Sequence, residues 1–319
     1  MKKILILIDV NEDQKQLFEK DGHQVLFFKK DEVQASDLKD ANIIIGNIKI
    51  ELLDHCEKLE YLHLYMAGSD KFAAHPKIKD KVILTNSTGC FGLAISEHML
   101  GNVLFFYKRF NQYYQNQLQA KYHPEGDVRS IHGAKVLVLG LGDIGDSFAK
   151  RMALLGSEIT GIKRTAGQKP DHLKNLYQMD RLDECLKEAD IVAMSLPNTN
   201  ETYHIINDER LSHMKDDVLL INVGRGQAID TQALIKHLKL RSLMSAALDV
   251  FEEEPLPKES ELWQLNNVQI TPHVSGARNL AYTSDKLFNL ALDNFNAYLN
   301  NQALTNVVDF KTGYRQSEV

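Results

Sequence analysis

Three glycines at a fixed spacing follow directly on an apolar run near the middle of the chain. The segment reads Val136-Leu-Val-Leu-Gly140-Leu-Gly142-Asp-Ile-Gly145, and a helical pattern continues after it. Such a run is typical of a buried strand, so the glycines occupy a strand-to-helix turn. In this turn Gly140 permits the sharp bend, Gly142 lets backbone approach a pyrophosphate, and Gly145 lets helix and strand pack closely. The spacing therefore predicts a dinucleotide-binding βαβ unit with the helix N-terminus facing the phosphates.

Short runs of apolar residues recur along the rest of the chain, separated by polar segments that can hold helices. They fall into two series, residues 4–8, 25–28, 43–45, 61–64 and 82–84, and then residues 135–139, 159–162, 191–194, 218–223, 246–250 and 268–270. Runs that are apolar throughout, rather than alternating, suit parallel strands covered on both faces. The sequence predicts an α/β protein with two doubly wound parallel sheets.

Composition narrows the possible partners. Of the 319 residues, 44% are hydrophobic and 25% are charged, and 43 acidic against 37 basic residues leave a formal charge of −6. Because no dense stripe of lysine and arginine appears, neither nucleic acid nor an anionic membrane is expected as a partner. A small diffusible substrate fits better.

The apolar runs and the cysteines indicate a cytoplasmic protein. The opening run ends at Asp9 with no cleavage site after it, and no stretch approaches the roughly eighteen apolar residues of a membrane span. Cys56, Cys90 and Cys185 are far apart and lack the spacing of a disulfide framework or a metal site. We therefore expect a reducing compartment and no bound metal.

Three residues of complementary chemistry follow the last apolar runs. They are Arg225 in Asn222-Val-Gly-Arg-Gly226, Glu254 in Asp249-Val-Phe-Glu-Glu-Glu-Pro255, and His273 in Thr271-Pro-His-Val-Ser-Gly276. If the runs are parallel strands, all three lie just beyond carboxyl ends, the edge where open α/β sheets bind ligands. A guanidinium, a carboxylate and an imidazole are the groups that reduction of a keto acid requires.

Taken together, these segments resemble the D-2-hydroxyacid dehydrogenases. The resemblance runs in the right order over residues 86–276 and includes Leu262-Trp263. Looser similarities extend it toward both ends, at Met66-Ala-Gly-Ser-Asp70, Thr85-Asn-Ser-Thr-Gly89, Ser96-Glu-His98 and Asn306-Val-Val-Asp309. It implies a Rossmann cofactor domain, residues 99–292, inserted into a flavodoxin-like substrate domain made of residues 1–98 and 293–319. The active site would lie in the cleft between the domains.

Chemistry and resemblance together assign roles to the three residues. The planar fork of Arg225 can hold the substrate carboxylate and polarise the carbonyl, which a lysine cannot imitate. His273 can give a proton to the carbonyl oxygen and take it back in the oxidation direction. Glu254 would hydrogen-bond the imidazole and favour its protonated form.

Neighbouring residues of the same types are expected to have other roles. We expect Glu252 and Glu253 to face solvent, and His98, the best alternative histidine, to be structural. A further substrate contact is expected from the backbone N–H groups of the small-residue loop Ala67, Gly68 and Ser69.

The cofactor loop departs from the commoner pattern of NAD enzymes. Where an acidic residue would bind the ribose 2′-hydroxyl, the second strand of the unit ends in Lys163, Arg164 and Thr165. Two cations and a hydroxyl suit a 2′-phosphate, so the sequence predicts NADP in preference to NAD. The resemblance implies further cofactor contacts at Asp143, Ile144, Ser195, Leu196, Pro197, Thr202, Val223, Gly224, Asp249, Ser275 and Gly276. Of these, Asp249 would accept a hydrogen bond from the nicotinamide carboxamide.

The leading hypothesis is an NADP-dependent reductase of a small 2-oxo acid to the D-2-hydroxy acid, with glyoxylate or hydroxypyruvate as substrate. Pyruvate, branched 2-oxo acids and phosphohydroxypyruvate remain alternative substrates. Phosphohydroxypyruvate would be the substrate of an NAD-dependent phosphoglycerate dehydrogenase-like enzyme. A dinucleotide-sensing, corepressor-like binding protein is the alternative class.

The segment between the two series has two interpretations. Residues 92–120 can form one long helix with a solvated end, or an arm that packs on a second subunit. With the second interpretation we expect a homodimer.

Overall fold

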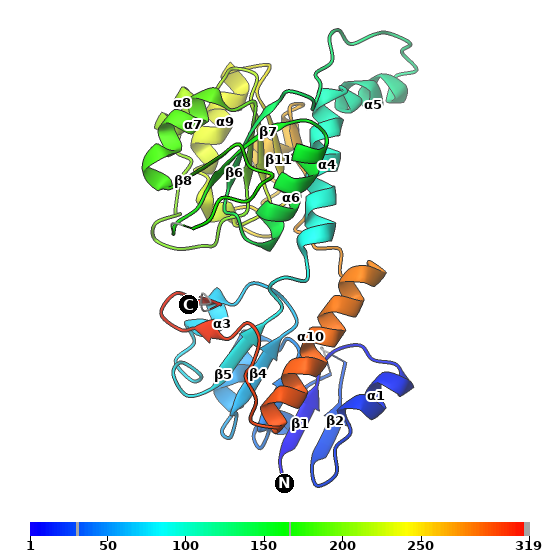
Figure 1. The fold of residues 1–319 in the computed structure, drawn as a ribbon. Coiled ribbons are helices and arrows are strands. Elements are labelled where there is room, and N and C mark those ends of the chain that lie inside the picture. The colour runs from blue at the N-terminus through cyan, green and yellow to red at the C-terminus, as the bar shows by residue number, and fades with distance from the viewer. Residues whose placement is uncertain (30–31, 166, 316–319) are drawn as a thin grey trace. The chain divides into compact units, whose positions relative to one another are not determined.

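The computed structural model describes residues 1–29, 32–165 and 167–315. The chain divides into two compact units, Met1–Cys90 with Arg278–Val319, and Phe91–Ala277. Each unit is an α/β structure built on one parallel sheet (Figure 1). Within the described residues, no helix is both long enough and apolar enough to cross a membrane.

The first unit has a five-stranded parallel sheet in the order β2-β1-β3-β4-β5. Its strands are β1 Lys3–Ile6, β2 Gln24–Phe27, β3 Ile43–Ile45, β4 Tyr61–Leu64 and β5 Ile83–Asn86. Its helices and its terminal hairpin are α1 Glu12–Phe18, α2 Ala35–Leu38, η1 Ile50–His55, α3 Asp70–Ala73, α10 Ala281–Leu299, β13 Val308–Asp309 and β14 Tyr314–Arg315. The strand order is that of a flavodoxin-like sheet.

Both faces of this sheet are buried, which explains why its strands are apolar throughout. Leu5 and Ile44 belong to the core on one face, while their neighbours Ile4 and Ile43 pack with Phe295 of α10 on the other. Successive side chains of a strand point to opposite faces, so a sheet covered on both sides needs an apolar residue at every position.

The second unit has a seven-stranded parallel sheet in the order β8-β7-β6-β9-β10-β11-β12. Its strands are β6 Lys135–Leu139, β7 Glu158–Ile162, β8 Asn175–Tyr177, β9 Ile191–Met194, β10 Leu219–Asn222, β11 Ser245–Leu248 and β12 Val268–Ile270. Its helices are α4 Gly92–Tyr107, α5 Phe110–Leu118, α6 Asp143–Leu154, η2 Met179–Arg181, α7 Leu182–Glu188, α8 Asp208–His213, η3 Gly226–Ala228, α9 Thr231–Leu240 and η4 Glu261–Gln264. The order reverses between β6 and β9, which is the switch point of a Rossmann sheet.

The register of this sheet aligns the carboxyl ends of five neighbouring strands. Leu139 pairs with Met194, Met194 with Asn222, Asn222 with Leu248, and Leu248 with Ile270. The loops that follow these residues therefore all leave the sheet at one edge, and they include the glycine turn and the loops of Arg225, Glu254 and His273.

The boundaries between the units differ from those predicted at residues 98/99 and 292/293. The second unit already begins at Phe91, because α4 packs along α6; a Cβ on Gly92 would lie 2.4 Å from Oδ1 of Asp143. The first unit resumes at Arg278, because Phe288 and Phe295 of α10 are buried in its core. Both predicted boundaries cut through a helix that packs as a whole in one unit.

Other local features also differ from the prediction. The segment 92–120 is not one helix, because Arg109 is left-handed, with φ +57°, between α4 and α5. Three short strands were not predicted, namely β8, β13 and β14. Each has only two or three residues, too few to show a periodic pattern.

Candidate active site

The three glycines have different surroundings. Gly140 has a φ of +91°, and a Cβ there would lie 2.9 Å from the carbonyl oxygen of Ser195. A Cβ on Gly145 would lie 1.9 Å from the carbonyl oxygen of Gly140, so α6 can pack on the end of β6 only without a side chain. A Cβ on Gly142 would meet nothing within 4 Å. Two glycines are thus required by the protein's own packing, whereas Gly142 faces open space.

That open space lies at the N-terminus of α6. The helix has twelve residues, its N-cap is Gly142, and no side chain within the described part of the chain caps it. Asp143 turns toward Gly92 of α4, and Ile144 is half-buried. Uncapped N–H groups at a helix N-terminus bind phosphate well, so this turn fits the pyrophosphate of a dinucleotide.

The predicted ribose-side residues support the turn from the next strand. The Ser195 hydroxyl donates to the carbonyl oxygen of Gly140 at 2.9 Å. The Thr202 hydroxyl donates to the carbonyl oxygen of Pro197 at 2.6 Å and accepts from the Thr199 N–H. Both hydroxyls thus bond to backbone atoms and shape the loop. Leu196 and Val223 are buried beside it, at the ends of β9 and β10.

A side chain that the sequence analysis left without a role shapes the turn of Arg225. Asn222 donates from Nδ2 to the carbonyl oxygen of Arg225 at 2.9 Å and accepts the Gly224 N–H at 3.1 Å. Arg225 is half-buried, and its Nη1 donates to the carbonyl oxygen of Gly224 at 2.8 Å. The amide of Asn222 therefore fixes the backbone from which the guanidinium extends.

The glycines on either side of Arg225 lie against neighbouring protein loops. In the structure a Cβ on Gly224 would lie 2.7 Å from backbone atoms of Leu196, and one on Gly226 would lie 1.8 Å from the carbonyl carbon of Phe251. The close neighbours are adjacent protein loops, so these glycines hold the loops together.

Glu254 and His273 form a direct pair. Glu254 Oε2 lies 2.8 Å from His273 Nδ1, and Glu254 Oε1 accepts the Phe251 N–H at 3.0 Å. The His273 side chain is 54% exposed, so a ligand has access to the ring. His273 is left-handed, with φ +54°. Because Glu254 occupies Nδ1, Nε2 is the nitrogen available to a ligand.

Asp249 organises the loop that carries His273. Its carboxylate, 1% exposed, accepts the Thr271 hydroxyl at 2.6 Å, the Val274 N–H at 3.0 Å and the Ser275 N–H at 3.1 Å. Since a carboxylate can accept about four hydrogen bonds, these three leave one for a cofactor amide. Asp249 therefore holds the His273 loop in shape, and its contact with the nicotinamide carboxamide stays a prediction.

His98 lies against the same loop, which the sequence did not indicate. Its Nε2 is 3.3 Å from the Thr271 hydroxyl. Burial lowers the pKa of His98, and the charge of Asp249 opposes this effect. A neutral imidazole is therefore favoured, as suits a structural partner of Thr271. Gly276, at the end of the loop, packs near the Phe91 ring.

The expectation that Glu252 faces solvent is wrong. Glu252 Oε1 lies 2.6 Å from His204 Nε2, and Oε2 accepts the Thr231 N–H at 2.8 Å. Glu253 is exposed, as expected.

The remaining predicted contacts lie in two places. Lys163, Arg164 and Thr165 are exposed at the carboxyl end of β7, accessible to a phosphate group. In the first unit, the Ala67 carbonyl oxygen accepts from Asn86 Nδ2 at 2.8 Å, and the buried Ser69 hydroxyl donates to the Gly313 carbonyl oxygen at 2.8 Å. Ser69 therefore has only backbone atoms to offer a substrate, like its neighbour Gly68.

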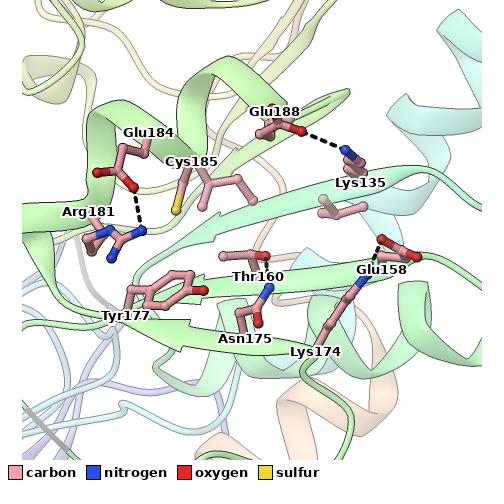
Figure 2. Close-up of a pocket in the computed structure, with 13 residues that line it drawn as sticks. Lys135, Glu158, Thr160, Lys174, Asn175, Tyr177, Arg181, Glu184, Cys185 and Glu188 are labelled. Atoms are coloured by element: carbon pink, nitrogen blue, oxygen red, sulfur yellow. Dashed lines mark hydrogen bonds and ion pairs between the residues drawn. The ribbon is translucent and has the colours of Figure 1, made fainter.

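A groove of about 240 Å³ lies elsewhere on the second unit (Figure 2). Lys135, Glu158 and Lys174 line it near the amino ends of β6, β7 and β8. Lys135 pairs with Glu188 at 2.6 Å and Lys174 with Glu158 at 2.8 Å. The groove runs from these amino ends to Tyr177, the last residue of β8, and none of the predicted site residues lines it. Within the described ranges, no cluster of His, Cys, Asp and Glu could hold a metal ion.

Comparison with known proteins identifies the family. Residues 100–275 match the family model described as "D-isomer specific 2-hydroxyacid dehydrogenase, NAD binding domain". The chain belongs to the D-isomer-specific 2-hydroxyacid dehydrogenases. It is therefore an NAD(P)-dependent oxidoreductase, and the resemblance inferred from the sequence is confirmed.

Named relatives of this dehydrogenase include reductases of small keto acids. A glyoxylate reductase of Pyrococcus horikoshii is 32% identical over 266 residues, covering 80% of this chain and 77% of the relative. A glyoxylate/hydroxypyruvate reductase B of Erwinia tasmaniensis is 32% identical over 271 residues, covering 83% of each. The D-isomer specific 2-hydroxyacid dehydrogenase of Xanthobacter autotrophicus, solved with NADPH and MES, superimposes with a TM-score of 0.81 at 26% identity, covering 98% of this chain and 99% of that one.

Proposed function

We propose that this dehydrogenase reduces a small 2-oxo acid with NADPH, using His273 as the acid, Glu254 as its partner and Arg225 as the carboxylate clamp. The observation that carries the proposal is the 2.8 Å contact between Glu254 Oε2 and His273 Nδ1 at the carboxyl edge of the sheet. It supplies an exposed imidazole of fixed orientation at the same sheet edge as a glycine turn suited to a dinucleotide.

In this proposal His273 handles the proton of the reaction. Bound NADPH supplies the hydride that adds to C2 of the substrate. His273 Nε2 gives its proton to the carbonyl oxygen, which becomes the hydroxyl of the product. Glu254, through Nδ1, holds the ring in orientation and stabilises its charged form until the proton leaves. In the oxidation direction the same nitrogen accepts the proton.

Arg225 binds the substrate carboxylate in this proposal. A guanidinium offers two parallel N–H donors to a carboxylate, which fixes the plane of the 2-oxo acid as well as its charge. Asn222 supports this role, because its amide holds the carbonyl oxygen of Arg225 in place. Backbone N–H groups at Ala67, Gly68 and Ser69 are proposed as further substrate contacts.

The preference for NADPH rests on the end of β7. Lys163, Arg164 and Thr165 are exposed there, where an NAD enzyme carries an acidic residue. A solved relative that holds NADPH supports the same cofactor. We expect kcat/KM for NADPH to exceed that for NADH by about tenfold or more, because charge-assisted hydrogen bonds to the 2′-phosphate are lost with NADH. Equal values for both cofactors would contradict this preference.

Glyoxylate and hydroxypyruvate are the proposed substrates, on the strength of the named relatives. The test is NADPH oxidation, followed at 340 nm, with a panel that includes glyoxylate, hydroxypyruvate, pyruvate, a branched 2-oxo acid and phosphohydroxypyruvate. We expect the highest kcat/KM with one of the first two. A higher value with phosphohydroxypyruvate and NADH would favour the phosphoglycerate dehydrogenase-like alternative. NADPH binding without turnover of any acid would favour the sensing alternative.

A homodimer is proposed from the segment around α5. Phe110, Tyr114, Leu118 and Tyr122 are all more than half exposed there. The segment projects from the body of the second unit (Figure 1). Apolar side chains gathered on a projecting element favour contact with a partner. Sedimentation equilibrium should give twice the chain mass, and Tyr114→Lys should lower it toward that of one chain.

A further inference from the structure

A second histidine–glutamate pair joins the loop of Glu254 to the loop after β9. His204 Nε2 donates to Glu252 Oε1 at 2.6 Å, and about 30% of each side chain is exposed. The His204 ring stacks on Tyr203 with centroids 4.1 Å apart. His204 is left-handed, with φ +46°, a conformation that a histidine adopts at a cost in free energy. The surrounding contacts must compensate this cost.

Glu252 connects three loops at the carboxyl edge of the sheet. Its Oε1 contacts His204, in the loop that also carries Thr202. Its Oε2 accepts the Thr231 N–H at 2.8 Å, and its carbonyl oxygen accepts from Gln227 Nε2 at 3.0 Å. Gln227 and Thr231 follow Arg225 in the chain. The Glu252 carboxylate therefore links the Thr202 loop to the segment after Arg225. Because Glu252 itself lies in the loop of Glu254, all three segments are joined.

The backbone next to Glu252 orients Glu254 directly. Glu254 Oε1 accepts the Phe251 N–H at 3.0 Å, and Phe251 is the residue before Glu252. Gly226 lies against the Phe251–Glu252 peptide, so close that a Cβ on it would lie 2.4 Å from the Glu252 nitrogen. The Glu252 side chain is anchored on both oxygens, which holds the Phe251–Glu252 peptide in place. The donor that aims Glu254, the Phe251 N–H, lies on the other side of the Phe251 Cα, so holding this peptide also restrains the donor.

We propose that His204 and Glu252 are a positioning pair, which holds Glu254 in hydrogen-bonding reach of His273. The inference rests on the proposed acid–base role of Glu254. Neither residue of the pair touches the substrate; both act through the backbone of Phe251 and Glu252. Removing the Glu252 carboxylate should therefore impair the reaction only as far as Glu254 contributes to it.

A double-mutant cycle tests the proposal. Glu252→Ala, Glu254→Gln and the double variant are compared with the parent enzyme for kcat and for the KM of NADPH, with glyoxylate or the best 2-oxo acid of the panel. Glu253→Ala is the matched control, because Glu253 is the exposed neighbour. Glu252→Gln is the conservative variant, since its amide can still accept from Thr231 and bond to His204. Thermal melts show that each variant is folded at the assay temperature.

We expect Glu252→Ala to lower kcat about tenfold and Glu254→Gln about a hundredfold, with the KM of NADPH unchanged. The double variant should match Glu254→Gln within about twofold, Glu252→Gln should recover part of the loss, and Glu253→Ala should have no effect. Multiplicative losses in the double variant, or full activity in Glu252→Ala, would overturn the positioning role. Full activity in Glu254→Gln would instead overturn the proposed acid–base role, and the positioning claim with it.

Discussion

Two histidine–glutamate pairs, His273–Glu254 and His204–Glu252, meet within three residues of one loop, and their surroundings differ. In the first, Glu254 contacts Nδ1 of a histidine whose side chain is 54% exposed, and Nε2 is available to a ligand. In the second, Glu252 contacts Nε2 itself, and the ring is stacked on Tyr203. The same two residue types thus give one pair that can exchange a proton with a ligand and one pair that joins loops. The access to the ring makes the difference, since the His204 side chain is only 29% exposed.

The largest effect should come from His273. We expect His273→Asn to lower kcat about a thousandfold, because the proton donor is lost. Adding Glu254→Gln to this variant should lower kcat little further, since a partner of the imidazole has nothing left to orient. Steady-state NADPH oxidation with the best 2-oxo acid measures both variants. A further hundredfold loss in the double variant would show that Glu254 acts independently of His273.

A smaller effect on kcat should separate Glu254 from its neighbour Glu253. Glu254→Gln should lower kcat about a hundredfold, whereas Glu253→Gln, the same chemical change one residue earlier, should stay within about twofold. Glu254 alone of these two contacts an imidazole. Similar losses in the two variants would mean that the charge of the loop matters rather than the pair.

Substitutions in the cofactor loop should weaken NADPH binding and leave the catalytic step unchanged. Replacing Lys163 and Arg164 with serine should lower kcat/KM for NADPH about tenfold and leave that for NADH nearly unchanged. The loss should appear in KM, because the substituted residues are far from the proton in the proposed mechanism. A fall in kcat with both cofactors would place these cations in the catalytic step.

The smallest effect concerns stability. Glu252→Ala removes two hydrogen bonds to a half-buried carboxylate and should lower the free energy of unfolding by about 1–2 kcal/mol. Glu254→Ala, whose pair is more exposed, should lower it by less than about 1 kcal/mol. Urea unfolding of both variants measures the difference. Equal losses would contradict the separation of the two pairs into a catalytic and a structural one.

The sequence predicted every strand of the two parallel sheets except β8, and the edge where the candidate residues gather. Apolar runs such as 135–139 and 191–194 mark buried parallel strands clearly, and parallel strands align their carboxyl ends at one edge. The pairing of Glu254 with His273 was expected from the resemblance, and the geometry brings them together.

Contacts between loops could not be predicted. Glu252 and His98 lie in segments that carry the resemblance, but their partners His204 and Thr271 are distant in sequence, so the contacts themselves leave no pattern. The packing of Gly224 and Gly226 against adjacent loops could not be predicted, because a glycine next to a ligand and one next to another loop look alike in a sequence. The unit boundaries were displaced for a similar reason, since the packing of α4 and α10 decides where each unit begins.

The most direct test of His273 as the proton donor is a single-turnover measurement with enzyme in excess over NADPH and a saturating 2-oxo acid. His273→Asn is compared with His204→Asn, in which asparagine tolerates the left-handed backbone. We expect both variants to bind NADPH as the parent does. Hydride transfer should slow about a thousandfold in His273→Asn and no more than about tenfold in His204→Asn. A His273→Asn variant that transfers hydride as fast as His204→Asn would contradict the role of His273.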